Sequence, residues 1–192
     1  MFLWIQNLGI LDVNFLSIWL PFPDSFISNK STWLPVQENF NSNSWADRWT
    51  VPTKWKAAGD LGEWKHTAGE FFADASDKGV QTSEDARFYG MSAKMDSTFD
   101  NTGKQLVLQF SVKHEQDLDC GGAYIKLLNG DVDQDSFGGD TAYSIMFGPD
   151  VCGSSNRKTH VIFNYPPKND NLLIKEEVCE CEPSVRHVMS CY

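Results

Sequence analysis

The chain has 192 residues, of which 41% are hydrophobic, so it is long enough to form one domain with a substantial core. Its formal net charge is −10 at pH 7, and it has no basic stripe that could neutralise phosphates, which argues against nucleic acid as a partner. The negative charge is compatible with cation binding, although an acidic surface needs no ligand to explain it.

The composition favours β-structure. Signals for helices are few, whereas Gly, Asn, Asp and Ser recur between short apolar runs, a pattern typical of many short strands. Seven Trp and thirteen Phe are many for this length. Such rings either fill a core between sheets or line a sugar site, and we expect the core to hold most of them.

The first 35 residues differ from the rest of the chain. Residues 1–22 are largely apolar, but Asp12 interrupts them and no positive charge precedes Lys30, which fits neither a regular secretory signal nor a membrane helix. Pro21, Pro23 and Pro35 are expected to break regular structure. We therefore expect residues 1–35 to be a divergent appendage, either a signal or anchor or an incorrectly assigned gene start, and residues 36–192 to form the domain.

The clearest strand runs from Leu106 to His114. Leu106, Leu108, Phe110 and Val112 alternate with mostly polar residues, which predicts an apolar inner face and a polar outer face.

Further strands follow along the chain. In Ala123–Leu128, which comes after a break at Gly121-Gly122, Tyr124 and Lys126 share one face of the predicted strand. Tyr143–Phe147 and Val161–Tyr165 are predicted strands, and another starts at Leu172. Short strands at this spacing predict two antiparallel sheets packed face to face.

Three segments carry a family resemblance. They are Lys113–Leu127 with its Cys-Gly-Gly step, Ile145–Gly153 with Phe-Gly-Pro-Asp-Val-Cys, and the strand His-Val-Ile-Phe-Asn-Tyr from His160. Together with Gln81–Tyr89, they closely resemble the calreticulin/calnexin family, and in particular the lectin domain of its calreticulin branch. The resemblance covers about residues 38–179.

The resemblance implies an all-β fold, a concanavalin-like jelly-roll sandwich of two antiparallel sheets that is incomplete at the C-terminus. The family continues with a P-domain arm that recruits a disulfide isomerase, and the calreticulin branch ends in an acidic tail. Neither follows in this sequence. Residues 36–192 are accordingly expected to be a partial lectin domain that does not recruit a disulfide isomerase.

The resemblance also implies a function: a lectin chaperone of the endoplasmic reticulum lumen that binds monoglucosylated high-mannose N-glycans on newly made, unfolded glycoproteins. Lys126 can donate hydrogen bonds to sugar hydroxyls, Asp140 and Asp150 can accept them, and Tyr124 offers apolar surface and a phenol. The matching carbohydrate-binding positions are Tyr124, Lys126, Gly139, Asp140, Tyr143, Met146 and Asp150.

Two further features come with the family. Cys120 and Cys152 match its disulfide, which implies an oxidising compartment. Asn39, Ser76 and Lys78 match its calcium site, where backbone carbonyl groups can serve as ligands whatever the side chain.

The sequence argues against an enzyme. It lacks the Glu-x-Asp-x-x-Glu pattern of jelly-roll glycoside hydrolases and the Gly-x-Ser-x-Gly elbow of serine hydrolases, and its four His residues show no metal-ligand spacing. Two alternatives stay open: a module that binds unfolded polypeptide without glycan specificity, and a truncated remnant without function.

Overall fold

The computed structural model describes residues 2–7, 12–19, 36–57, 59–96, 100, 102–103, 106–116, 119–128, 130, 132–164, 173–177 and 187–191. Within these ranges, no helix is long and apolar enough to cross a membrane. The end of the predicted strand Val161–Tyr165 and the predicted start at Leu172 lie outside the described residues.

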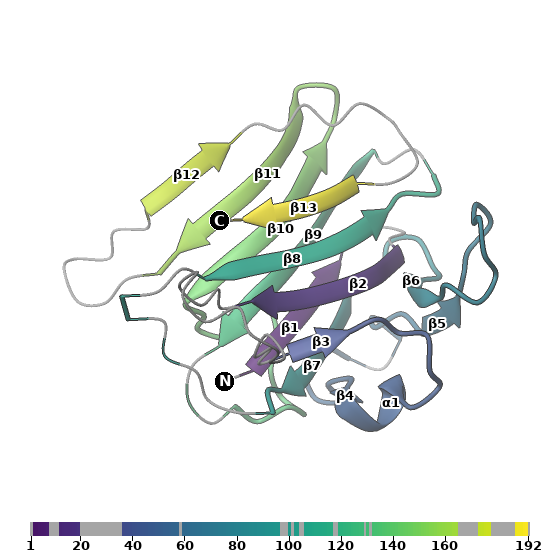
Figure 1. The fold of residues 1–192 in the computed structure, drawn as a ribbon, viewed down its shortest axis with the longest axis horizontal. Coiled ribbons are helices and arrows are strands. Elements are labelled where there is room, and N and C mark those ends of the chain that lie inside the picture. The colour runs from purple at the N-terminus through teal and green to yellow at the C-terminus, as the bar shows by residue number, and fades with distance from the viewer. Residues whose placement is uncertain are drawn as a thin grey trace, which may run out of the picture.

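The larger sheet contains seven strands, each antiparallel to its neighbours (Figure 1). Their order across the sheet is β12 (Leu173–Glu177), β11 (Asn156–Phe163), β10 (Ile145–Cys152), β9 (Cys120–Leu128), β1 (Phe2–Asn7), β7 (Tyr89–Lys94) and β4 (Trp49–Thr50).

The smaller sheet contains six strands and is also antiparallel. Its main path is β13 (His187–Cys191), β8 (Val107–Lys113), β2 (Asp12–Trp19), β6 (Gly79–Thr82) and β5 (Trp64–Thr67), and β3 (Val36–Glu38) pairs with β2. One short helix, α1 (Trp45–Arg48), precedes β4 in the described part of the chain. The predicted mostly β, antiparallel structure is confirmed.

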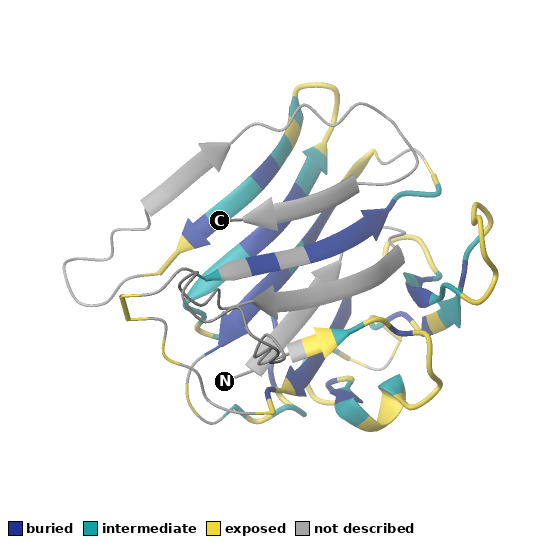
Figure 2. Cartoon of the chain, viewed as in Figure 1, coloured by how far each residue is buried: buried dark blue, intermediate teal, exposed yellow. Residues whose placement is uncertain are grey.

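Aromatic rings from the two sheets meet in the core. Phe110 of β8 packs edge to face on Phe147 of β10, and Trp64 of β5 does the same on Tyr89 of β7, each with ring centroids 5.3 Å apart. Burial of such rings removes large apolar areas from water, so these contacts hold the sheets together. Figure 2 shows the buried residues running along β7, β9, β10 and β8.

The pattern predicted for strand β8 is confirmed for its apolar face and not for its polar face. Leu108, Phe110 and Val112 are buried, as the alternation predicts. The expectation of a polar outer face open to water is wrong, because Ser111 and Lys113 are only 5% and 4% exposed. A segment far away in the sequence covers Lys113, whose ammonium donates hydrogen bonds to the carbonyl group of Ala68 and to that of Phe71.

The N-terminal segment contributes two strands, although its composition led us to expect no regular element there. β1 lies between β7 and β9 in the larger sheet, and β2 lies between β8 and β6 in the smaller one (Figure 1). Both strands precede Pro21, the first of the three prolines. The division of the chain at residue 35 stays a prediction.

Candidate functional site

Strand β9 carries two candidate residues, Tyr124 and Lys126, on the face that points away from the core. The alternate residues Ala123, Ile125 and Leu127 belong to the core and are at most 3% exposed. Because successive side chains of a strand point to opposite sides, Tyr124 and Lys126 share the other side, as the sequence predicts. We call this side of β9 and β10 the outer face.

Strand β10 adds Met146 and Asp150 to the outer face. In the antiparallel register, Met146 lies opposite Lys126, and Asp150 lies opposite Gly122. Residues directly opposite each other in a sheet point to the same side, so Tyr124, Lys126, Met146 and Asp150 share this face.

Two glycines make room for this arrangement. A Cβ atom at Gly122 would lie 2.6 Å from the ring of Tyr124, so the phenol lies over Gly122 and reaches toward Asp150. A Cβ atom at Gly148 would lie 1.9 Å from the backbone oxygen of Ala123, so only glycine lets β10 approach β9 there. The predicted break at Gly121-Gly122 is wrong, since β9 runs through it from Cys120.

The Tyr124 hydroxyl group lies close enough to the Asp150 carboxylate for the two groups to interact electrostatically. Burial, and then the negative charge of Asp150, raise the pKa of Tyr124 far above its usual value. Tyr124 therefore stays a neutral phenol at physiological pH, beside a carboxylate.

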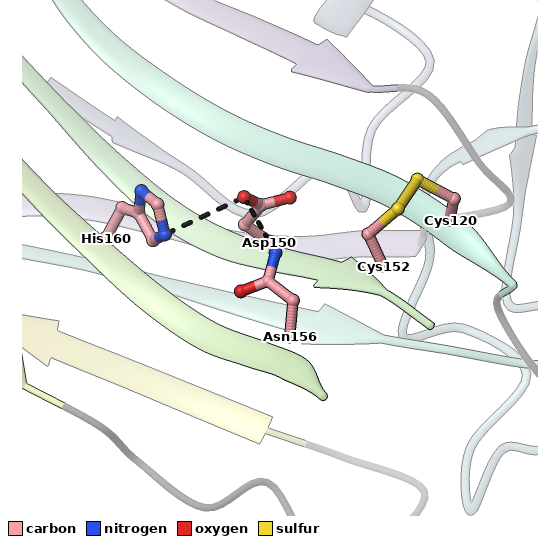
Figure 3. Close-up of a disulfide and its surroundings, with 5 residues drawn as sticks. All are labelled: Cys120, Asp150, Cys152, Asn156 and His160. Carbon is pink, nitrogen blue, oxygen red and sulfur yellow. Dashed lines mark hydrogen bonds and ion pairs between the residues drawn. A yellow bond between two sulfur atoms is a disulfide. The ribbon is translucent and has the colours of Figure 1, made fainter. Parts of the chain in front are cut away.

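Asp150 has two further neighbours on β11, one at the start of the strand and one in its middle (Figure 3). The amide Nδ2 of Asn156 donates to Oδ2 of Asp150 over 3.3 Å, and Nε2 of His160 lies 3.6 Å from the same oxygen. The side chains of Asp150 and His160 are 28% and 21% exposed, so the carboxylate lies in a partly desolvated environment.

Lys126 is more buried than an exposed sugar-contacting residue would be, with only 4% of its surface accessible. Its Nζ donates to the carbonyl oxygen of Gly139 over 3.0 Å and lies 5.0 Å from the centroid of the Tyr143 ring. Burial lowers the pKa of Lys126 to about 8, against the opposing effect of the Asp140 charge. The ammonium therefore anchors the segment that carries Gly139, Asp140 and Tyr143.

A small apolar cluster, to which Tyr143 belongs, stabilises the segment that carries Gly139 and Asp140. Tyr143 and Trp55 pack against the buried residues Leu128 and Phe137. A Cβ atom at Gly138 would lie 1.9 Å from the Trp55 ring, so glycine is needed where the two loops meet. Trp55 thus lies beside the outer face.

The disulfide between Cys120 and Cys152 is confirmed (Figure 3). The two residues lie directly opposite each other where β9 begins and β10 ends. The link therefore holds together the ends of the two strands that carry Tyr124 and Asp150.

The three candidate calcium ligands lie in two adjacent loops. The backbone N–H of Lys78 donates to Oδ1 of Asn41 over 2.9 Å, which joins the loop of Asn39 to the loop of Ser76. Hydrogen bonds from the side chain and backbone of Ser76 lower the pKa of Asp74. No group of three or more His, Cys, Asp or Glu side chains suited to a metal occurs in the described residues.

All seven predicted sugar-site residues gather around the outer face: Tyr124, Lys126, Gly139, Asp140, Tyr143, Met146 and Asp150. Sequence reasoning missed Asn156, His160 and Trp55 as neighbours of this site. Their signals are weak, because each lies in another segment and only the pairing of β10 with β11, or the packing of Trp55 on Gly138, brings it close.

The chain is similar to known proteins over most of its length. The calreticulin family model matches residues 36–189. The chain is 54% identical over 149 residues to calreticulin of Chlamydomonas reinhardtii, which covers 76% of this chain and 35% of that protein. It is 56% identical over 140 residues to calreticulin of Dictyostelium discoideum, covering 73% of this chain and 32% of that protein. The chain thus spans about a third of the length of these relatives.

Proposed function

Since the chain belongs to the calreticulin family, we propose that it is a lectin chaperone module that binds monoglucosylated high-mannose N-glycans of newly made glycoproteins and assists their folding. The family consists of chaperones without enzymatic activity. Glycan binding and its specificity are proposed here for the outer face alone.

One observation carries this proposal: the phenol of Tyr124, beside the Asp150 carboxylate, lies on the same face as Lys126, whose ammonium contacts the Tyr143 ring. Sugars offer many hydroxyl groups and apolar C–H faces. A carboxylate accepts from hydroxyls, a neutral phenol can both donate and accept, and aromatic rings cover the C–H faces. This set of groups suits a neutral carbohydrate better than an anion or an apolar ligand.

A glycan array tests the proposal. The wild-type chain is expected to bind monoglucosylated high-mannose chains selectively, and Lys126→Ala is expected to abolish the binding because it removes the cation that anchors Gly139 and Tyr143. Lys65→Ala is the matched control, since it removes the same charge from an exposed position on β5 of the other sheet. Equal binding of glucosylated and unglucosylated chains would reject the proposed specificity.

We propose the family's concanavalin-like jelly-roll sandwich as the arrangement of the two sheets. The contacts of Phe110 with Phe147 and of Trp64 with Tyr89 support it, because each pair joins one sheet to the other. We also propose the lumen of the endoplasmic reticulum, where homologues of this family reside. The Cys120–Cys152 disulfide supports an oxidising compartment.

We further propose one calcium ion near Asn39, Ser76 and Lys78, held mainly by backbone carbonyl oxygens, which are ligands that calcium accepts. The Lys78–Asn41 hydrogen bond supports it, because it keeps the two loops together. Titration calorimetry is expected to show binding heat at calcium concentrations up to millimolar, the weak range of protein calcium sites. Absence of heat at millimolar calcium would count against the site.

The alternative, binding of unfolded polypeptide without glycan specificity, has one observation in its favour. Phe71 and Phe72 are adjacent and 55% and 54% exposed, which is unusual for large apolar side chains on a folded surface. Binding to the same glycan array, measured beside binding to an unfolded, unglycosylated protein, distinguishes the glycan-binding function from this alternative. Binding only to the unglycosylated protein would favour this alternative.

A further inference from the structure

The Asp150 side chain accepts a hydrogen bond from Asn156, which follows the short turn between β10 and β11. β10 ends at Cys152, β11 begins at Asn156, and these two residues lie opposite each other in the sheet. Cys152 is also linked covalently to Cys120 at the start of β9. The position of Asn156 is therefore tied to the strand that carries Tyr124, and its side-chain amide donates to Oδ2 of Asp150 over 3.3 Å.

His160 lies on the other side of the same carboxylate oxygen (Figure 3). Its Nε2 is buried and has no hydrogen-bond partner. The 3.6 Å between Nε2 and Oδ2 of Asp150 is too long for a hydrogen bond, but it is within the range of an ion pair when the imidazole carries a proton. A small rotation of either side chain would satisfy the buried nitrogen, and leaving such an atom without a partner is costly.

From these contacts we propose that Asn156 and His160 are positioning residues, which fix the Asp150 carboxylate in an orientation beside the Tyr124 hydroxyl that presents its remaining acceptor capacity to sugar hydroxyls. The inference rests on the proposed glycan site and deepens it.

The physical reason is preorganisation. A carboxylate with 28% of its side chain exposed can adopt several rotamers, and a ligand that needs one of them loses affinity by fixing it. Two neighbours that restrict Asp150 in the free protein remove part of that cost before the sugar binds. Neither neighbour needs to contact the sugar for this effect.

The sharpest test replaces Asn156 with its isostere. Asn156→Asp keeps the shape but turns the donor into an acceptor with the same charge as Asp150, so the affinity for a monoglucosylated glycan is expected to fall about tenfold, the effect of a hydrogen bond lost beside a charged group. Asn156→Ala is expected to cost about threefold, at the low end of the same range. Asn164→Asp is the matched control, because Asn164 is exposed and follows the far end of β11.

A double-mutant cycle shows whether Asn156 acts through Asp150. In an Asp150→Asn background, Asn156→Asp is expected to have no further effect on affinity. For His160, Gln keeps a nitrogen donor whereas Leu does not, so His160→Gln is expected to retain more affinity than His160→Leu. Equal losses in the two backgrounds, or equal affinities of the Gln and Leu variants, would show that the residues act only on the fold.

A measurement without sugar separates this inference from the glycan proposal. With tyrosines labelled at Cζ, the NMR signal of Tyr124 in the free protein is expected to shift in Asn156→Asp and not in Asn164→Asp. If the wild type binds no glycan but the signal shifts, the glycan proposal fails and the positioning of Asp150 stands. An unchanged Tyr124 signal in Asn156→Asp overturns the positioning role.

Discussion

A variant that lacks residues 1–19 is expected to lose its cooperative thermal unfolding transition. β1 forms six residue pairs with β7 and six with β9, and β2 pairs with β8, β6 and β3. Removing these strands would leave a gap within each sheet, with unpaired backbone groups on both sides of it. At about 0.5–1.5 kcal/mol for each lost hydrogen bond, the total loss is comparable with the whole stability of a typical domain, about 5–15 kcal/mol.

Differential scanning calorimetry of the full chain and of the deletion variant measures this effect. Ile5→Pro is expected to act in the same direction without shortening the chain, because it removes a backbone donor in the middle of a strand that is paired on both sides. If the deletion variant keeps a sharp transition at an unchanged temperature, residues 1–19 are an appendage, as their composition suggests.

Glu115→Ala is expected to lower the free energy of unfolding by about 3–5 kcal/mol, because it removes the carboxylate that neutralises the buried cation of Lys113. The two side chains are 5% exposed each, and Nζ of Lys113 lies 2.8 Å from Oε1 of Glu115. The same carboxylate accepts hydrogen bonds from the backbone N–H groups of Glu70 and Phe71. The pair therefore holds the segment around residue 70 against β8.

Chemical denaturation compares this variant with Glu63→Ala, which removes an exposed carboxylate and is expected to change stability by less than about 0.5 kcal/mol. If Glu115→Ala lowers the free energy of unfolding no more than Glu63→Ala does, the Lys113–Glu115 pair contributes nothing to stability. Lys113→Met, which removes the cation instead, should be destabilising as well, since it leaves Glu115 buried with its charge.

The contribution of Glu115 to the free energy of unfolding is expected to depend on pH. Burial alone would raise the pKa of Glu115, but the hydrogen bond from Lys113 and those from the N–H groups of Phe71 and Glu70 outweigh it, so the pKa lies below its usual value. A carboxyl group whose pKa is lowered by folding stabilises the folded state fully at pH values above its unfolded-state pKa of about 4.3. This stabilisation is lost as the pH falls through the folded-state pKa. The stability difference between wild type and Glu115→Gln should accordingly narrow below about pH 4.

Sequence reasoning predicted the strands whose apolar residues alternate regularly. β8 and β9 are found within one to three residues of their predicted limits, because one face of each packs against the core. The same reasoning could not predict that Lys113 is buried, since its cover comes from Ala68 and Phe71 about forty residues away. Polar residues in a strand indicate a different face from the apolar ones, but they do not show whether another segment covers that face.

The residues of the candidate site were predicted from the family resemblance, whereas their contacts and their burial could not be predicted from the sequence. The positions of Tyr124 and Lys126 on one strand were predictable from their spacing. The burial of Lys126 under Gly139 depends on a loop conformation that no periodic pattern encodes. The same holds for Asn156, whose contact with Asp150 depends on the register of β10 with β11.

Titration calorimetry with one oligomannose chain, measured with and without its terminal glucose and from pH 6.5 to 9.5, tests the lectin function most directly. We predict binding heat only for the glucosylated chain, and an affinity that declines as the pH rises through about 8, where buried Lys126 loses its proton. Identical heats for the two chains would contradict the proposed specificity for the terminal glucose, and no heat for either chain at neutral pH would contradict a carbohydrate site on the outer face.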